Sequence, residues 1–260
     1  MLDLNTATSH FTQEKELKEV HARKCDNYFN IITDNAKSIG MKIIAEKTQL
    51  LCFNDCNYSK TKSFIYTSPT EKITSGPEMK ILGFIFNEKP TVKAHIDYSI
   101  KKTNRVMWAL SHLRKAGLPD VVLTNVYCSM LRSIIEFCNV VYHSMLTEEM
   151  NLEIERVQKM ALKIIYGFNL SYEKLLKKSG LSTLKTRRES AFLKFANTLA
   201  NNQRYTDWFP TADQLNYSLR TNKKYSEFYA RTNRLYTSPL YTMRRVLNTG
   251  NEDNEETTEI

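Results

Sequence analysis

The feature that most constrains this chain is the spacing of its apolar residues, which becomes helical near His95. From there to about residue 200, apolar side chains recur every three or four residues, a spacing that places them on one face of an α-helix. Four segments show the pattern. They predict a helix over residues 95–115, a second from Pro119 to about residue 142, a third that carries Ile154 to Ile165 and stops at Gly167, and a fourth over 185–200. Because short segments connect the first three, we expect those helices to pack as an antiparallel bundle.

The same spacing predicts which side chains enter the core. In the second segment the predicted inward set is Val122, Val126, Tyr127, Met130, Ile134, Phe137, Cys138 and Val141. In the last segment it is Ala191, Phe192, Phe195 and Leu199. Both sets follow from the 3.6-residue turn of a regular α-helix.

The first third of the chain is organised differently. Residues 14–39 carry one apolar helical face, and Gly40 is suited to end that helix in a left-handed conformation. Four short apolar runs follow, separated by turn-forming residues, and they predict strands at 41–44, 50–53, 64–67 and 80–86. The expected fold class is therefore α+β, with a small antiparallel sheet followed by a mainly helical bundle.

An excess of basic side chains favours a polyanionic partner. The chain has 37 Lys and Arg residues against 28 Asp and Glu, which gives a net charge of +9. The last ten residues carry five acidic groups and no basic one, so residues 1–250 alone hold a charge of +14. A nucleic acid binds such a surface because each neutralised phosphate releases counterions. A solubilising coat of lysine side chains explains the same composition without a ligand.

Other parts of the composition bear on compartment and chemistry. The five cysteines are an odd number and the polar N-terminus has no secretory signal, so we expect an intracellular protein of the nucleus or cytoplasm. The apolar stretch 121–142 is interrupted by polar and charged residues, and we expect no membrane span. Cys52 and Cys56 lack further ligands at a spacing typical of zinc sites. We therefore predict no metal site, and no motif for a small-molecule cofactor is present.

After residue 210 the helical spacing weakens, and tyrosines and arginines are interspersed up to residue 250. Aromatic rings beside guanidinium groups can stack on unpaired bases while the cations hold phosphates. The same tyrosines can instead cover the helices as a loosely packed extension, and the sequence leaves both interpretations open. The acidic segment 251–260 is expected to be disordered.

Several motifs occur in an order that is typical of one polymerase family. The first two are Gly-Met-Lys-Ile-Ile-Ala-Glu-Lys-Thr at residues 40–48 and Met-Lys-Ile-Leu-Gly-Phe at residues 79–84. The basic segment 95–115 follows, then Arg-Ser-Ile-Ile-Glu-Phe at 132–137. The last two are Leu-Glu-Ile-Glu-Arg-Val-Gln-Lys-Met-Ala at 152–161 and Gly-Leu-Ser-Thr-Leu-Lys-Thr-Arg-Arg at 180–188. Each motif alone is weak, and the likeness rests on their shared order.

Together these segments resemble the reverse transcriptases of non-LTR retrotransposons of the jockey and LINE-like kind, from just after the catalytic core. Residues 40–48 are similar to palm motif D, although Ile44 stands where the family usually has Asn, and residues 79–84 are similar to motif E, the primer grip. The resemblance covers roughly residues 10–200. The domains that it implies are a partial palm at 1–92, a helical thumb at 93–168, a basic, aromatic-rich helical extension at 169–250 and an acidic disordered tail at 251–260.

The resemblance also implies an incomplete catalytic centre. The family holds two divalent metal ions, Mg²⁺ in the intact enzyme, on palm carboxylates, and the ions neutralise the attacking hydroxyl and the leaving pyrophosphate. Its aromatic-x-Asp-Asp motif would fall at or before Met1: Asp3 aligns with the second Asp, which places Leu2 at the first. One carboxylate near the chain end offers little against a hydrated ion. We therefore expect no bound metal or other cofactor in this chain, and no polymerase activity by the chain alone.

The resemblance assigns roles in nucleic-acid binding to a small set of residues. Lys47 would lie near the triphosphate of the incoming nucleotide, as the lysine of motif D. The candidate nucleic-acid-binding residues are Leu82, Gly83, Lys101, Lys102, Arg105, Arg187 and Arg188. Of these, the first two would form the turn that supports the primer end, and the helical cations would face an RNA–DNA hybrid. A solvated lysine, an ordinary hairpin turn and a solvated helix face explain the same residues without a ligand.

The expected function is therefore that of a truncated RNA-directed DNA polymerase fragment that holds a primer–template, either an RNA–DNA hybrid or a DNA duplex. The upstream polymerase and endonuclease parts of the parent enzyme would be its further partners. Two alternatives remain: a non-catalytic nucleic-acid-binding protein derived from such an element, and a helical scaffold whose charge is only a solvated coat. Binding to nucleic acid that weakens steeply with salt distinguishes the first two from the scaffold.

Overall fold

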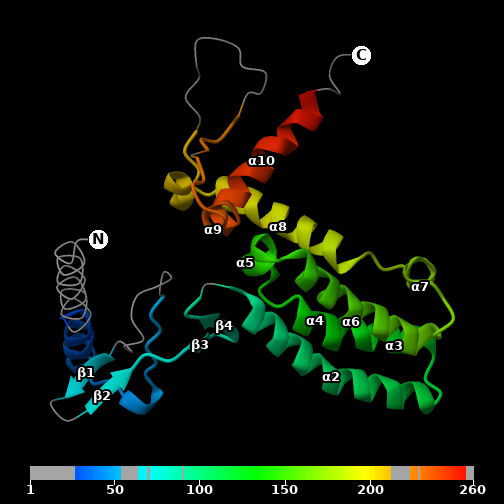
Figure 1. Cartoon of the computed structure of the whole chain (residues 1–260), viewed down its shortest axis with the longest axis horizontal. Helices are drawn as coiled ribbons and strands as arrows, with labels where there is room; N and C mark the ends of the chain where they lie inside the picture. Colours follow the sequence, from blue (N-terminus) through cyan, green and yellow to red (C-terminus); the bar gives the residue numbers. More distant parts are fainter. Residues whose placement is uncertain are drawn as a thin grey trace, which may run out of the picture. The chain divides into compact units, whose positions relative to one another are not determined.

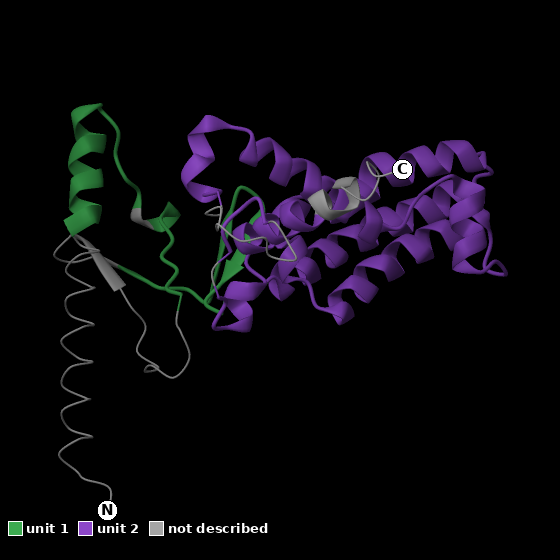
Figure 2. Ribbon diagram, turned by 90° about the horizontal axis from the view of Figure 1, so that it is seen from above, with its two compact units in different colours: residues 1–91 green, residues 92–260 purple. Residues whose placement is uncertain are grey.

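The chain folds into two compact units, residues 1–91 and residues 92–260 (Figure 2). The computed structural model describes residues 27–53, 64–68, 71–89, 91–211, 223–227 and 229–255. Over these residues the first unit contains strands and one helix, whereas the second contains helices and short helical turns. The predicted α+β class is confirmed, and helix predominates.

The helix of the first unit ends where the sequence predicts. Residues 27–38 are helical, and Gly40 follows with φ of +76°. The Gly40 amide donates to the Lys37 carbonyl at 3.0 Å, and the Met41 amide donates to the Ala36 carbonyl at 2.8 Å. These bonds satisfy carbonyls that a helix end leaves without partners. The predicted part of this helix before residue 27 lies outside the described residues.

Two β-hairpins follow in the same unit. Strands β1 (Phe64–Ser68) and β2 (Glu71–Thr74) pair antiparallel, and so do β3 (Glu78–Ile81) and β4 (Phe84–Asn87). The run 80–86, predicted as one strand, is thus the end of β3, a two-residue turn and the start of β4. The two hairpins form separate two-stranded sheets, where the sequence predicts a single small sheet.

The two strands predicted at 41–44 and 50–53 are absent from the described backbone. Residues 41–44 have no regular structure, a 3-10 turn covers Ala45–Lys47, and Leu50 makes only an isolated bridge to Ser75. The Thr48 hydroxyl donates to the Ile44 carbonyl at 2.9 Å. Such a local bond offers the backbone an alternative to strand pairing.

The second unit is built from helices, and as far as Trp208 short segments connect them (Figure 1). The longer helices are α2 (Lys93–Lys115), α3 (Asp120–Val126), α6 (Glu148–Tyr166), α7 (Tyr172–Ser179), α8 (Leu184–Ala200) and α10 (Pro239–Glu255). The shorter ones are the π-helix Tyr127–Leu131, α4 (Arg132–Ile135), α5 (Asn139–Tyr142), α9 (Asn233–Tyr236), and the 3-10 turns His143–Met145 and Gln203–Trp208. Helix α2 packs against α6 and α4, and α8 packs against α5 and α10.

The helix predicted at 119–142 is interrupted twice, and its predicted core set was largely wrong. The buried residues are Leu123, Tyr127, Leu131, Ile135 and Tyr142, whereas four members of the predicted set are exposed: Val122, Met130, Phe137 and Val141. The first interruption is the π-helix, in which the Arg132 amide donates to the Tyr127 carbonyl. In a regular α-helix each four-residue step turns about 40° past a full circle, so a run of such steps drifts around the helix; the wider π turn removes part of that drift.

The second interruption lies at Cys138, which has φ of +56°. A left-handed residue cannot continue a right-handed helix, so α5 starts again at Asn139 with a new direction. In α8 the predicted core set is right in part. Phe192 is fully buried as predicted, but Phe195 is exposed, and Ala196 lies in the core instead of Phe195. These shifts explain why the four-residue pattern alone gave the wrong register.

A buried polar network fixes the middle of the second unit. The Tyr127 hydroxyl donates to the Gln158 side-chain oxygen at 2.5 Å, and the Gln158 amide donates to the Tyr172 hydroxyl at 2.8 Å and to the Ser182 carbonyl at 3.0 Å. Tyr172 also donates to Glu155. The network joins the π-helix, α6, α7 and the start of α8, and it satisfies polar groups that would be costly to bury alone.

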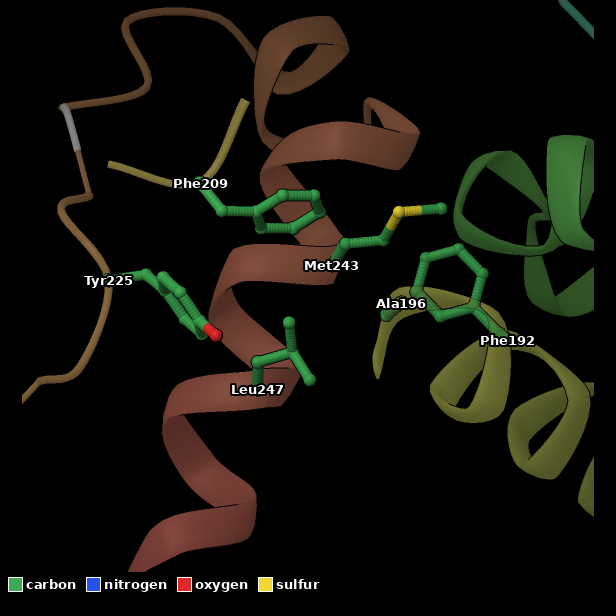
Figure 3. Close-up of a cluster of buried hydrophobic side chains, with 6 residues drawn as sticks. All are labelled: Phe192, Ala196, Phe209, Tyr225, Met243 and Leu247. Atoms are coloured by element: carbon green, nitrogen blue, oxygen red, sulfur yellow. The ribbon is translucent and has the colours of Figure 1, made fainter. Parts of the chain in front are cut away.

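The C-terminal part of the unit packs on α8 through a cluster of buried, mainly apolar residues (Figure 3). Its members are Phe192, Ala196, Phe209, Tyr225, Met243 and Leu247. Asn248 binds the backbone of Tyr225 twice, accepting from its amide at 2.9 Å and donating to its carbonyl at 3.1 Å. Arg244 donates to the Trp208 carbonyl at 2.8 Å. Helix α10 therefore contributes to the core of the second unit.

This packing decides between the two interpretations of several tyrosines after residue 210. Tyr225 and Tyr241 are buried and cover the helices, whereas Tyr229 is 89% exposed. Helix α10 continues to Glu255, so its backbone extends into the segment 251–260 for which the composition predicts disorder. Residues 256–260 lie outside the described part of the chain.

Candidate nucleic-acid interface

Helix α2 presents an exposed basic face that its sequence predicts. Its buried side consists of His95, Ile96, Ser99, Thr103 and Leu110, which recur at helical spacing. The opposite side carries Lys101, Arg105, Trp108, His112 and Lys115, all exposed. We refer to these five residues as the α2 stripe. Their spacing of four, three, four and three residues places them in one line along the helix.

Ion pairs hold both ends of α2 in place, and they are formed by residues other than those of the α2 stripe. At the start, the Lys93 ammonium donates to Glu153 of α6 at 2.7 Å and lies 3.1 Å from Asp97. The hydrogen bond to Glu153 and that to Asp97 raise the pKa of Lys93. At the end, Arg114 donates to Asp120 at 2.6 Å. These contacts hold α2 against the neighbouring helices.

The cations of the middle of α2 are available to a ligand. Within the described part of the chain, no carboxylate lies at ion-pair distance from Lys101, Lys102 or Arg105. All three side chains are exposed. Lys102 lies beside the α2 stripe, about 100° around the helix from Lys101. The structure therefore brings together these three sequence-predicted residues on one helix, with no carboxylate of the described residues at ion-pair distance from them.

An aromatic pair occupies the same line. The ring centroids of Trp108 and His112 are 3.9 Å apart, and His112 Nδ1 is 2.9 Å from the Trp108 carbonyl oxygen. Because a carbonyl oxygen only accepts, Nδ1 carries the proton in this contact. The Trp108 side chain is nevertheless 66% exposed. Sequence reasoning missed both residues, although their positions three and seven residues after Arg105 place them in line with it.

Arg187 and Arg188, the adjacent arginines of the last shared motif, have other partners. Arg187 forms a two-pronged pair with Glu136, with nitrogen–oxygen distances of 2.7 and 3.1 Å, and this contact raises its pKa. Arg188 is 1% exposed and donates to Asn151 at 2.7 Å, and burial lowers its pKa. Burial removes Arg188 from the residues that can contact a phosphate at the surface, and Arg187 is engaged within the protein.

The predicted site residues of the first unit lie on separate elements. Lys47 is an exposed residue at the end of the 3-10 turn Ala45–Lys47. No other predicted site residue lies on this turn, so the role of Lys47 near a triphosphate stays a prediction. Leu82 and Gly83 form the β3–β4 turn, with φ of +49° and +94°. Asp3 lies outside the described residues.

The described residues contain no group of three or more His, Cys, Asp or Glu side chains placed to hold a metal ion. In the same part of the chain, no single helix is long and apolar enough to cross a membrane. The bent pair Asp120–Ile135 and Asn139–Met145 has that length and apolar character only when its two segments are taken together. Comparison with protein-family models, with curated proteins and with solved structures finds no match to this chain.

Proposed function

We propose that this chain binds the backbone of a nucleic-acid duplex through α2, as the thumb of a reverse transcriptase of the non-LTR retrotransposon kind holds its primer–template. The observation that carries the proposal is the set of exposed cations Lys101, Lys102 and Arg105, which have no carboxylate partner among the described residues. By contrast, two other arginines of the second unit are paired with carboxylates: Arg114 with Asp120, and Arg187 with Glu136.

The electrostatics of α2 support phosphate binding. A cation that is already paired must give up its partner before it contacts a phosphate, whereas an exposed cation exchanges only mobile counterions. Lys101 and Arg105 are separated by one helical turn, about 6 Å along the helix axis. A backbone that runs along the helix therefore meets positive charge on successive turns, and the net charge of +9 attracts it over a longer range.

The β3–β4 turn supports the same function from the first unit. Leu82 is 94% exposed and has positive φ, an uncommon backbone conformation for a residue with a branched side chain. In the family that the sequence resembles, this turn belongs to the primer grip. An exposed leucine at the tip of a hairpin suits an apolar contact with the sugar face of a primer end.

The proposal assigns no polymerase activity to the chain by itself. The carboxylates that hold Mg²⁺ in the family are proposed to come from a further polymerase part, and endonuclease activity from another. The protein is proposed to act inside the cell, in the nucleus or cytoplasm, and to require no small-molecule cofactor. Its ligand is proposed to be an RNA–DNA hybrid or a DNA duplex.

One observation favours a second candidate, a helical scaffold that binds another protein. Five apolar side chains of the segment from α3 to α5 are exposed: Val121, Val122, Met130, Phe137 and Val141. Exposed apolar groups that form a continuous patch are typical of protein-binding surfaces. A scaffold function predicts that charge on α2 is irrelevant to binding, so one experiment can separate the two functions.

The test measures binding of the full chain to a blunt RNA–DNA hybrid by fluorescence anisotropy, at salt concentrations between about 50 and 200 mM. The variant Lys101→Glu/Lys102→Glu/Arg105→Glu is compared with Lys159→Glu/Lys174→Glu/Lys194→Glu, which makes the same charge change at exposed positions on α6, α7 and α8. We expect the α2 variant to lose at least about tenfold in affinity. The slope of log affinity against log salt should fall by about three, close to one for each lost phosphate contact.

Equal losses in the two variants would mean that only the overall charge matters and would contradict a site on α2. Absence of binding by the unaltered chain at low salt would favour the scaffold instead. Circular dichroism on both variants checks that the helices remain folded, so that a loss of affinity reports on the surface.

A further inference from the structure

Trp108 is exposed, and in the described structure its ring contacts His112 of the same helix. It lies in the middle of the 23-residue helix α2, on the side away from α6, and 66% of its side chain is accessible. Tryptophan is large and mostly apolar, and such a side chain is usually well buried in a folded protein. The core of the unit is complete without it, because Ile96 and Leu110 supply the buried face of the same helix.

The neighbours of Trp108 distinguish between kinds of ligand. The residues one turn away along the helix are Asn104, Arg105, Ser111 and His112, and none of these is an apolar side chain. Two turns away on either side lie Lys101 and Lys115. A protein-docking surface normally surrounds an exposed tryptophan with further apolar groups. An isolated aromatic ring between cations is instead typical of proteins that stack a base while holding its phosphates.

His112 controls the geometry of the ring. Its imidazole lies against the indole with an interplanar angle of 37°, and its Nδ1–H donates to the Trp108 carbonyl. The hydrogen bond fixes the imidazole on the helix, and the imidazole covers part of one face of the indole. Because Trp108 is 66% exposed, this contact leaves most of the indole accessible, and a ring that already has a packing partner loses less conformational freedom when a ligand stacks on it.

From these contacts we infer that the α2 stripe is a binding site for a single strand of nucleic acid, in which an unpaired base stacks on Trp108 while Arg105, Lys101 and Lys115 hold phosphates. The inference rests on the proposed function and adds a second ligand for the same helix face, an unpaired strand, which contacts Lys101 and Arg105 in place of a duplex backbone. In a duplex the bases are stacked and paired inside, so a ring on a helix surface reaches a base only where the strand is unpaired. At a primer–template this is the single-stranded template beyond the duplex.

The length of the stripe sets the size of the site. Lys101 and Lys115 are 14 residues apart, which corresponds to about 21 Å along the helix axis. A stacked strand rises about 3.4 Å per nucleotide, so the stripe spans about six nucleotides. This value lies within the range of about 4–16 nucleotides found for single-strand-binding domains.

The experiment combines affinity and fluorescence. Because the chain contains only two tryptophans, Trp208→Phe leaves Trp108 as the single emitter. An oligothymidine of about 12 nucleotides is added to this variant, and base stacking should quench its emission saturably. Affinities are then measured for Trp108→Ala, for Trp108→Phe and for the control Trp208→Ala, which removes the other partly exposed tryptophan. The probes are the oligothymidine, a blunt RNA–DNA hybrid and the hybrid with a single-stranded overhang.

We expect Trp108→Ala to weaken binding of the oligothymidine and of the overhang probe by about tenfold or more, and Trp108→Phe to retain most of the affinity. Binding of the blunt hybrid should change by less than about twofold, since phosphates alone hold it. Trp208→Ala should leave all three affinities unchanged. Because Trp108 is exposed, its replacement should not unfold α2, and circular dichroism checks this.

The two proposals fail in different ways. If the blunt hybrid binds through Lys101, Lys102 and Arg105 but emission is not quenched and Trp108→Ala has no effect, the stacking site is refuted and the proposed function stands. If none of the probes binds at low salt, both are refuted. Equal weakening of all three probes by Trp108→Ala would also overturn the inference, because it would assign Trp108 to duplex binding.

Discussion

Two adjacent arginines of α8 have different roles because consecutive residues of a helix point about 100° apart. Arg187 points to Glu136 at the end of α4, whereas Arg188 points into the core beside Asn151. Arg188 lies four residues before Phe192, which the spacing correctly placed in the core. Helical periodicity therefore contained the signal that Arg188 faces inward. The motif assigned both arginines one role, and the geometry of the helix separates them.

His143 provides a prediction about pH at the same scale. Burial lowers its pKa from 6.5 to about 4, and the positive charge of Arg188 acts in the same direction. The folded protein therefore keeps His143 neutral, while the unfolded chain takes up a proton below about pH 6.5. Unfolding is favoured as the pH falls from 6.5 to 4, and the corresponding loss is about 3 kcal/mol of stability at most. Above pH 6.5 the contribution of His143 is constant.

This prediction is checked by urea unfolding of the full chain and of His143→Gln at several pH values between about 4 and 7.5. The range covers the pKa of His143 in the folded protein, about 4, and in the unfolded chain, 6.5. The unaltered chain should lose stability more steeply than the variant over that interval. Carboxylates titrate in both proteins, so the difference between them isolates the histidine. Parallel curves would show that the folded state protonates His143 as readily as the unfolded chain does.

At the scale of the element, the β3–β4 hairpin carries local strain at its tip. The pairing of Ile81 with Phe84 leaves Leu82 and Gly83 as a two-residue loop, and both have positive φ. This is the pattern of a type I′ turn, for which Asn-Gly is the favoured sequence. A leucine in the first position costs roughly 1–2 kcal/mol relative to a residue that tolerates the left-handed region.

Leu82→Asn is therefore expected to stabilise the hairpin and Gly83→Ala to destabilise it. Hydrogen exchange of the β3 and β4 amides measures the local effect, and Leu82→Asn should slow exchange by about five- to thirtyfold. If Leu82 also contacts a primer end, the same variant should bind the blunt hybrid more weakly than the unaltered chain. A faster exchange in Leu82→Asn would show that the leucine side chain, despite its exposure, stabilises the turn.

The elements differ in how far their sequence determines them. Helices α2, α6 and α8 were predicted within a few residues, because each buries one face and ends near a glycine or a polar residue. The Thr147 and Thr183 hydroxyls accept amide hydrogen bonds at the first turns of α6 and α8. The segment 120–142 was not predictable in the same way. Which of its side chains face the core depends on a π-helix that begins at Tyr127 and on a left-handed residue at Cys138. The spacing of apolar residues indicates neither feature.

The candidate site was predicted in part for the same reason. The cations of α2 follow from the face opposite to the buried one, which the spacing defines. Trp108 was missed because the prediction selected only cations on the outer face of this helix. The signal for its exposure is its position: Trp108 lies seven residues after Lys101 and three after Arg105, and therefore in line with them on the helix.

At the scale of the whole molecule, the core is concentrated in one unit. Of the buried apolar residues in the described parts of the chain, only Ile73 and Phe84 belong to residues 1–91, and the rest lie in residues 92–260. Buried apolar area provides most of the free energy of folding. The second unit thus has the means to fold by itself, whereas the described residues of the first bury only these two apolar side chains.

We predict that a fragment of residues 92–260 unfolds cooperatively in urea with a midpoint close to that of the full chain. Its far-ultraviolet circular dichroism should be strongly helical, and its affinity for the blunt hybrid should depend on Lys101, Lys102 and Arg105 as in the full chain. Residues 1–91 alone should show no cooperative transition. A fragment 92–260 that unfolds without a transition would show that the first unit is required for the second.

Helix α10 also determines when this unit can finish folding during translation. Among the elements that build the core, α10 is synthesised last, yet Met243 and Leu247 cover Phe192 of α8 and Asn248 fixes the backbone at Tyr225. Until those residues leave the ribosome, at about 5–20 residues per second, the apolar end of α8 stays uncovered in the nascent chain. A message that stops before residue 239 therefore yields a polypeptide with a permanently open core, a natural substrate for chaperones and proteases.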